Sequence, residues 1–175
     1  MEKQNEKTGC KQLLAKGLSL LLGLCLVFTG MPGAIASIHT YPDKDQQVMY
    51  RSLQTLRDER GQAWQIVFYK QVKDGVVGSL HLRLVGFPGV TELEHPRSLH
   101  ITEGSGKAWD APDVFATSRL KPELGVHVGE YDLKPVIDVL GTKRPLWLEI
   151  PLAESTTEIP IPPFAMREWQ QVLDR

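Results

Sequence analysis

The chain has 175 residues, with 20 basic and 21 acidic side chains and a net charge of −1. Four lysines and two glutamates lie in the first 36 residues, so the rest carries 16 basic and 19 acidic side chains, a net charge of −3. This balance excludes the basic stripe of a nucleic-acid-binding protein and the polybasic patch that binds anionic lipid headgroups. Both cysteines, Cys10 and Cys25, also lie in the first 36 residues, so the rest has no disulfide, thiol nucleophile or cysteine-ligated metal site.

The first 36 residues have the pattern of an export signal. A net-positive start is followed by an uncharged run over residues 17–30, and Ala34 and Ala36 supply the small residues of an A-x-A cleavage site. We therefore predict a signal peptide over residues 1–36, cleaved before Ser37. The alternative is an uncleaved membrane anchor, because residues 17–38 carry no charge and are long enough to span a bilayer.

The remainder is predicted to form a polar extended arm over residues 37–47 and one β-rich domain over residues 48–175. Strands are expected where β-branched and aromatic residues alternate with polar ones between turn signals such as Asp74-Gly75. The alternation is clearest in the third strand, where Val76, Leu80, Leu82 and Leu84 fall on one face and Ser79, His81 and Arg83 on the other. The predicted strands are residues 48–57, 62–72, 76–86, 98–102, 107–110, 146–152 and 157–162.

Two short helices are predicted in the second half of the domain. Asp132 can cap the first, in which apolar residues recur at helical spacing up to a stop at Gly141. The second runs from Pro163 to about Leu173, with an apolar stripe that should dock on the sheet. About seven strands and two short helices, one of them C-terminal, indicate an α+β fold built on an antiparallel sheet or a small barrel.

Residues with catalytic or metal-binding chemistry are sparse. A surface metal site would use His95, His100 and Glu94, but the two histidines are five residues apart with a proline between them, which fits neither usual ligand spacing. We expect the five histidines to be scattered and solvent-facing, and Glu130 to be a loop residue. No nucleophile elbow or phosphate-binding glycine loop is present in the sequence. No catalytic residue, metal site or cofactor is assigned.

One strand face has the composition of a protein-docking surface. Tyr69 is expected beside His81 and Arg83 on the face opposite the aliphatic residues, and Trp147 lies opposite the aliphatic set of its own strand. Exposed aromatic residues beside arginine are typical of protein interfaces. The alternative is that the C-terminal helix covers this face and makes Trp147 part of the core.

The aliphatic face offers a second possibility. Trp64, Ile66 and Phe68 face the same way as the leucines of the third strand and would line a barrel cavity for an apolar ligand if the sheet closed. A filled core is the default for a β domain of this size.

Four segments together resemble one family: VMYRSLQTLRDERGQAWQ (48–65), SLHLRLVGFPGV (79–90), GEYDLKPV (129–136) and IPPFAMREWQ (161–170). This order resembles an uncharacterised family of small cyanobacterial proteins with an export signal, classified as domain of unknown function 3122. The resemblance implies a cyanobacterial source and a periplasmic or thylakoid-lumen location. It implies no catalytic residues, because no activity is established for that family.

Three functional hypotheses follow. The first is a non-enzymatic interaction or assembly module in the periplasm or lumen that docks on a photosynthetic or cell-envelope membrane complex. The second is a lipocalin-like carrier for a lipid or pigment. The third is an enzyme with a non-obvious site.

Overall fold

A computed structural model describes residues 39–42, 47–117, 125–136 and 144–175. The chain divides into two units, Met1–Ile35 and Ala36–Arg175, and every described residue belongs to the second. The predicted cleavage site at Ala34, Ala36 and Ser37 therefore lies outside the described residues. Within the described part of the chain, no helix has the length and apolar character needed to cross a membrane.

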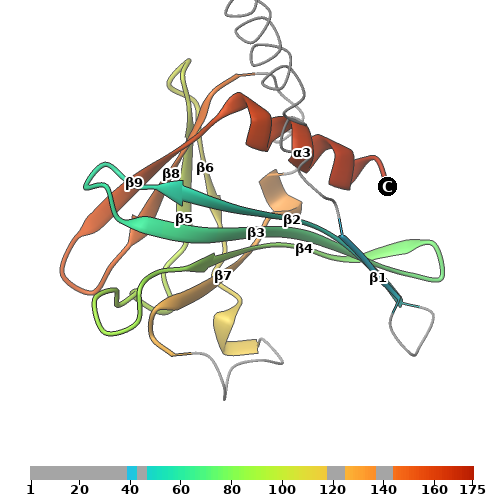
Figure 1. Cartoon of the computed structure of the whole chain (residues 1–175), viewed down its shortest axis with the longest axis horizontal. Helices are drawn as coiled ribbons and strands as arrows, with labels where there is room; N and C mark the ends of the chain where they lie inside the picture. The colour runs from blue at the N-terminus through green and yellow to red at the C-terminus, as the bar shows by residue number, and fades with distance from the viewer. Residues whose placement is uncertain (1–38, 43–46, 118–124, 137–143) are drawn as a thin grey trace, which may run out of the picture. The chain divides into compact units, whose positions relative to one another are not determined.

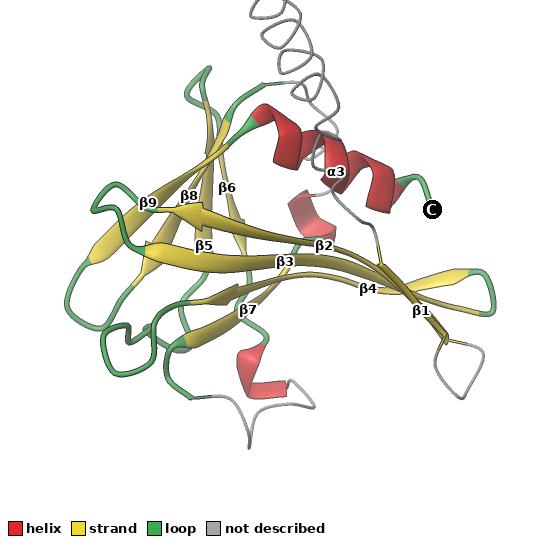
Figure 2. Ribbon diagram, viewed as in Figure 1, coloured by secondary structure: helices red, strands yellow, loops and turns green. Residues whose placement is uncertain are grey.

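The described residues form two antiparallel sheets and a C-terminal helix. The strands are β1 (His39–Pro42), β2 (Gln47–Arg57), β3 (Ala63–Lys73), β4 (Val76–Val85), β5 (Leu99–Glu103), β6 (Ala108–Ala111), β7 (Val128–Asp132), β8 (Leu146–Pro151) and β9 (Thr156–Ile161). The first sheet has the order β1-β2-β3-β4-β7 and the second the order β6-β5-β8-β9 (Figure 1). Helix α3 spans Pro163–Leu173, and two short 3-10 turns span Phe115–Thr117 and Lys134–Val136 (Figure 2).

All seven predicted strands are present, and two more were not predicted from the sequence. Strand β1 lies in the segment expected to be an extended arm, and its four residues pair with Val48–Arg51 of β2. Strand β7 lies where a loop and a helix cap were expected. It shows no alternation because four of its five residues are buried, on both faces of the sheet.

The β3–β4 hairpin turns at the predicted position. Asp74 and Gly75 have φ values of 51° and 77°, as an Asp-Gly hairpin turn requires. The pairing shifts register between Gln71 and Val72, and the hairpin tip carries Val76, which is 68% exposed. The prediction that Val76 lies on the buried face is therefore wrong, because the tip extends beyond the core.

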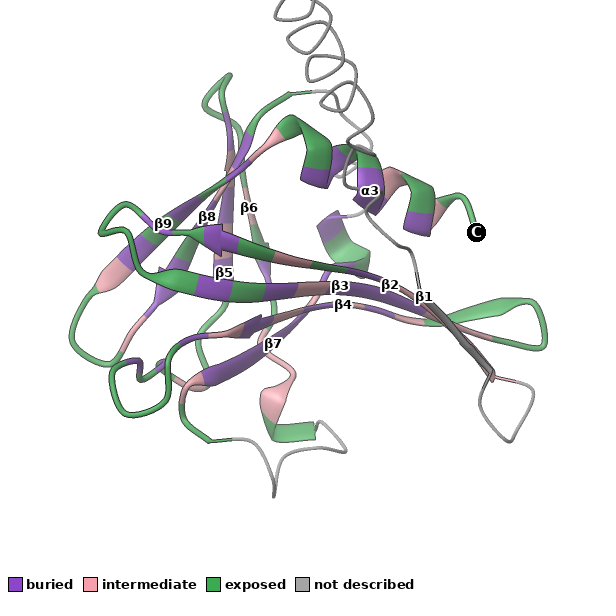
Figure 3. Ribbon diagram, in the orientation of Figure 1, coloured by how far each residue is buried: buried purple, intermediate pink, exposed green. Residues whose placement is uncertain are grey.

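A single core lies between the sheets and α3. Leu80, Leu82 and Leu84 of β4 are fully buried and share this core with the inward residues of β8 and the buried face of α3 (Figure 3). The Phe68 ring stacks on Trp169 of the helix with a centroid distance of 5.1 Å. The C-terminal helix and its docking stripe are thus confirmed.

The barrel alternative is wrong for the described residues. The strands form two open sheets and not a closed barrel. The residues predicted to line a cavity, Trp64, Ile66 and Phe68, are at most 1% exposed and are packed among the other core residues.

The first predicted helix is confirmed only at its start. Asp132 caps this segment, because its Oδ1 accepts a hydrogen bond from the backbone N–H of Lys134 at 2.9 Å. A 3-10 turn over Lys134–Val136 follows, and residues 137–143 lie outside the described part. A second α-helix is therefore not confirmed.

The two sheets are joined at one corner by a buried carboxylate. Asp58 accepts hydrogen bonds from Trp64 Nε1 at 3.1 Å and from Thr157 Oγ1 of β9 at 3.0 Å. Its other oxygen accepts hydrogen bonds from the backbone N–H groups of Arg60 and Gln62 in the β2–β3 turn. The Asp58 side chain therefore holds the turn of the first sheet against the edge of the second.

Candidate functional site

The strongest candidate site is a cluster of four polar side chains on the outward face of the first sheet. It comprises Tyr69 of β3, His81 and Arg83 of β4, and Glu130 of β7. Strand register brings them together, because Tyr69 pairs with His81 and Arg83 pairs with Glu130. Directly paired residues of antiparallel strands place their side chains on the same face. We call these four residues the Glu130 cluster.

The carboxylate of Glu130 is the centre of the cluster. The Tyr69 hydroxyl donates to Oε1 at 2.5 Å, and His81 Nδ1 lies 2.9 Å from the same oxygen. Arg83 donates to Oε2 through Nε at 3.2 Å and Nη2 at 2.9 Å. The carboxylate thus binds three different side chains from two neighbouring strands.

The electrostatics follow from this arrangement. Burial alone would raise the pKa of Glu130, but the hydrogen bonds from His81 and Tyr69 and the charge of Arg83 outweigh it and lower the pKa to about 2. Burial, together with the hydrogen bond and charge of Glu130, raises the pKa of the Tyr69 hydroxyl. Glu130 is therefore ionised at neutral pH, and Tyr69 stays a hydrogen-bond donor.

The same contacts fix the tautomer of His81. Its Nδ1 faces the Glu130 carboxylate and, at 3.1 Å, the Tyr69 oxygen, whose own hydrogen is donated to Glu130. Both neighbours accept hydrogen bonds, so Nδ1 carries a proton. The other ring nitrogen, Nε2, makes no hydrogen bond to a described residue.

His81 and Arg83 form the outer layer of the cluster. The Arg83 guanidinium lies 5.5 Å from the centroid of the Tyr69 ring, and the His81 ring meets Tyr69 edge-on at 5.5 Å. The side chains of His81 and Arg83 are 22% and 21% exposed, whereas that of Glu130 is 4% exposed. The cluster therefore presents a guanidinium and an imidazole at its surface, held by a carboxylate beneath them.

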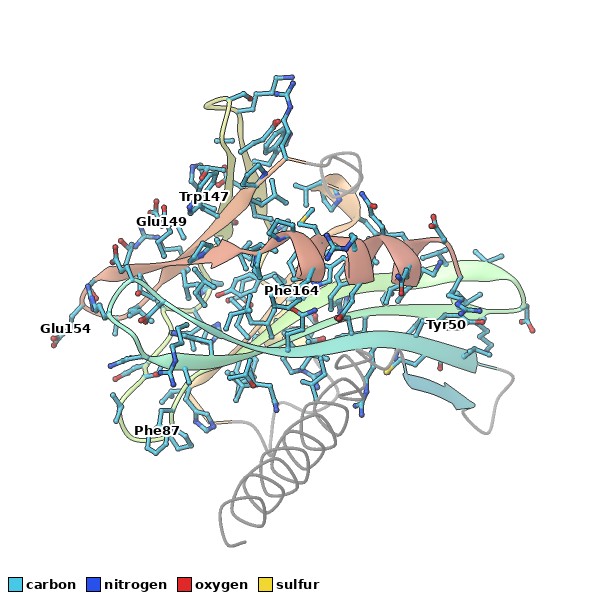
Figure 4. The ribbon with its side chains drawn as sticks, turned by 45° about the horizontal axis from the view of Figure 1, so that its top comes forward. Tyr50, Phe87, Trp147, Glu149, Glu154 and Phe164 are labelled. Atoms are coloured by element: carbon cyan, nitrogen blue, oxygen red, sulfur yellow. The ribbon has the colours of Figure 1, made fainter. Side chains whose placement is uncertain are left out.

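Trp147 lies apart from the Glu130 cluster. It belongs to β8 of the second sheet, where it pairs with Thr102 and Pro160, and it is half-buried. Figure 4 shows Trp147 and Glu149 on the same strand, and the inward residues of β8 are Leu146, Leu148 and Ile150. The structure thus brings together three of the four predicted docking residues and separates Trp147 from them.

Glu130 was not predicted as a site residue. Its strand, β7, pairs with β4 on one side and with the segment that follows β6 on the other. On that second side, Val114 N donates to Glu130 O at 2.8 Å and Asp132 N donates to Pro112 O at 2.9 Å. No alternating pattern marks this strand, so the sequence carries no signal that distinguishes Glu130 from a loop carboxylate.

The described histidines are more structured than expected. His95 Nδ1 lies 2.5 Å from Asp113 Oδ2, its Nε2 lies 3.1 Å from Val128 O, and its ring stacks on Phe115 at 4.4 Å. His100 Nδ1 lies 2.8 Å from Asp110 Oδ1. The expectation of solvent-facing histidines is wrong for His95 and His81, because each is partly buried against a carboxylate.

The proposed metal ligands do not form a site. Glu94 pairs with Arg97 at 2.7 Å and not with a histidine. Among the described residues, no group of three or more histidines, cysteines and carboxylates is arranged to hold a metal ion.

Fold and site define a small α+β domain in which two packed antiparallel sheets carry a carboxylate-centred charged cluster on one outer face. The chain belongs to the family described as protein of unknown function (DUF3122), whose family model matches residues 36–172. No curated protein and no solved structure matches the chain.

Proposed function

We propose that this protein is an exported, non-enzymatic interaction module that docks on a membrane protein complex through the outward face of β3, β4 and β7. The observation that carries the proposal is the Glu130 carboxylate, which is buried beneath Arg83 and His81 and bonded to both. It fixes the direction of the two side chains that a partner would meet.

The free-energy cost of burying the Glu130 carboxylate supports a role of the cluster in recognition. Burying the Glu130 carboxylate removes it from water, and a buried ion pair contributes little net stability compared with apolar residues of similar size. A fixed guanidinium, by contrast, loses little conformational entropy when it binds, which favours a specific interface. We infer that orientation of Arg83 for a partner is a role of the cluster beside its contribution to stability.

The charge of this face indicates the chemistry of the partner. The row next to Arg83 runs across four strands, because Arg51 of β2 pairs with Tyr69, Tyr69 with His81, and His81 with Asp132 of β7. The Glu130 carboxylate is 4% exposed and bonded to Arg83, whose own side chain is 21% exposed, so the cluster itself presents a guanidinium to a partner. We infer that the partner presents an acidic segment, whose carboxylates a guanidinium can bind in bidentate geometry.

The export part of the proposal concerns the first 36 residues. The second unit of the chain begins at Ala36, and the family match begins at the same residue, next to the predicted cleavage site. Both boundaries separate the first 35 residues from the domain, as a removed signal peptide or, alternatively, a retained anchor requires. A cyanobacterial source with a periplasmic or thylakoid-lumen location, and a photosynthetic or envelope complex as partner, complete the proposal.

The test is co-migration of the tagged protein with a membrane complex on native gels of cells that produce it. We expect the wild type to co-migrate, Arg83→Ala to run free, and Lys107→Ala to behave as the wild type. Lys107 is a matched control because it is an exposed cation in the β5–β6 turn of the other sheet. A free wild-type monomer in every fraction, or unchanged co-migration of Arg83→Ala, would overturn the proposal.

A further inference from the structure

A second site lies in a pocket of about 350 Å³ beside the first turns of α3. Its walls are largely apolar and come from Pro145, Ile161, Pro163 and Met166, and two arginines, Arg144 and Arg167, also line it. This volume is at the lower end of the range for small-molecule sites, which are concave, mostly apolar and equipped with a few polar groups.

The local fold keeps the apolar walls rigid. Leu146 pairs with Ile161, so the start of β8 and the end of β9 lie side by side. The chain then passes from Ile161 through Pro162 into α3, which has a proline in its first turn. Proline fixes its own φ angle, so this side of the pocket is preformed.

The charges of the two arginines decide which ligand fits. Arg144 Nη1 lies 2.8 Å from Glu103 Oε1, while its side chain remains 60% exposed. Arg167 is exposed and makes no hydrogen bond or ion pair with a described residue. Glu103 therefore compensates the charge of Arg144, whereas the charge of Arg167 has no partner among the described residues.

We propose that this pocket binds a single-chain aliphatic carboxylate. The acyl chain lies against the prolines, Ile161 and Met166, and the carboxylate accepts two hydrogen bonds from the guanidinium of Arg167. The pocket volume suits one acyl chain and is too small for a two-chain lipid.

Ligand binding in this pocket would be a function separate from docking. The pocket lies beside α3 and not in the core between the two sheets. The carrier hypothesis located a ligand between the sheets, where Trp64 and Phe68 now fill the space. The pocket shares no residue with the Glu130 cluster, so Arg83→Ala should leave ligand binding unchanged.

The test is calorimetric titration of the purified protein with dodecanoate as the probe. We expect one site per chain, at least a tenfold loss of affinity in Arg167→Ala, and no change in Arg175→Ala, an exposed arginine beyond the end of the same helix. Dodecylamine, which has the same chain and the opposite charge, should not compete. Absence of dodecanoate binding, or equal affinity in Arg167→Ala, overturns the proposal.

A second measurement locates the acyl chain. In protein labelled with ¹³C at the methionine methyl groups, dodecanoate should shift the Met166 signal and leave that of Met49 in place. Met49 is a matched internal probe because it lies on β2, outside the pocket. Binding that leaves the Met166 signal unmoved would show detergent-like association with the surface and would overturn the proposal.

Discussion

Arg83 and Glu130 are direct cross-strand partners on β4 and β7, and the guanidinium places Nε and Nη2 within 3.2 Å of one carboxylate oxygen. Their pairing depends on register, because a slip of one residue would move Glu130 to the inner face and Tyr131 to the outer face. Tyr131 is fully buried in the core, so its packing fixes the face of the sheet on which the neighbouring Glu130 lies. The fold and the Glu130 cluster are therefore coupled through β7.

The first prediction concerns acid stability. The folded-state pKa of Glu130 is about 2, below its ordinary value of 4.5, so the folded state binds its proton less readily than the unfolded state. The resulting stabilisation, about 3 kcal/mol, is complete above the unfolded pKa and is lost as the pH falls from about 5 to about 2. Urea unfolding at several pH values should show this loss.

Glu130→Gln provides the comparison. It should be less stable than the wild type at pH 7, and the difference in free energy of unfolding should shrink toward pH 3. A difference that stays constant across this range would contradict the assignment of the acid dependence to Glu130.

The second prediction concerns the corner between the sheets. Asp58→Ala removes the acceptor of Trp64 Nε1 and Thr157 Oγ1 and leaves both donors buried. We expect a loss of about 2 to 4 kcal/mol in the free energy of unfolding. Glu59→Ala, an exposed acid at the next position, should change stability by less than about 0.5 kcal/mol. Equal stabilities of the two variants would show that Asp58 does not join the sheets.

The third prediction concerns the docking of α3. Trp169 is 1% exposed and stacks on Phe68, so Trp169→Ala should cost about 3 to 5 kcal/mol. Phe164→Ala changes an aromatic residue of the same helix that is 48% exposed, and it should cost less than about 1 kcal/mol. Chemical denaturation measures both, and a similar cost for both variants would mean that the helix does not pack as described.

The fourth prediction separates two histidines. His95→Ala breaks the contacts with Asp113 and Val128 O beside a buried carboxylate, so it should lower stability by about 1 to 3 kcal/mol. His100→Ala breaks an exposed pair with Asp110 and should cost less than about 1 kcal/mol. Thermal unfolding monitored by circular dichroism gives both values. A larger loss in His100→Ala would reverse the roles assigned to these residues.

Much of the fold was predictable because one-sided burial leaves an alternating pattern in the sequence. Strand β4 illustrates this, since Leu80, Leu82 and Leu84 are fully buried while His81 and Arg83 remain partly exposed. Strand β7 was not predictable, because it is buried on both faces. Position along a strand also does not reveal where the core ends, which is why Val76 was misplaced at the hairpin tip.

The candidate site was predictable in part for a related reason. Alternation and hairpin pairing placed Tyr69 next to His81 and Arg83, because the turn at Asp74-Gly75 fixes the register of β3 and β4. Glu130 joins them through a contact between β4 and a strand 47 residues further along the chain. Trp147 was misplaced because an alternating pattern predicts the face of a strand on which a residue lies. The pattern does not predict which sheet the strand joins.

The most direct test of the docking face is photo-crosslinking in cells that produce the protein. A photoreactive amino acid at Val67, which pairs with Arg83, lies on the proposed face, and one at Ala108 lies on an exposed position of β6. We predict a crosslink to a membrane-complex subunit from position 67, lost when Arg83→Ala is added, and none from position 108. A crosslink from position 108 alone, or one from position 67 that persists in Arg83→Ala, would contradict docking through the Glu130 cluster.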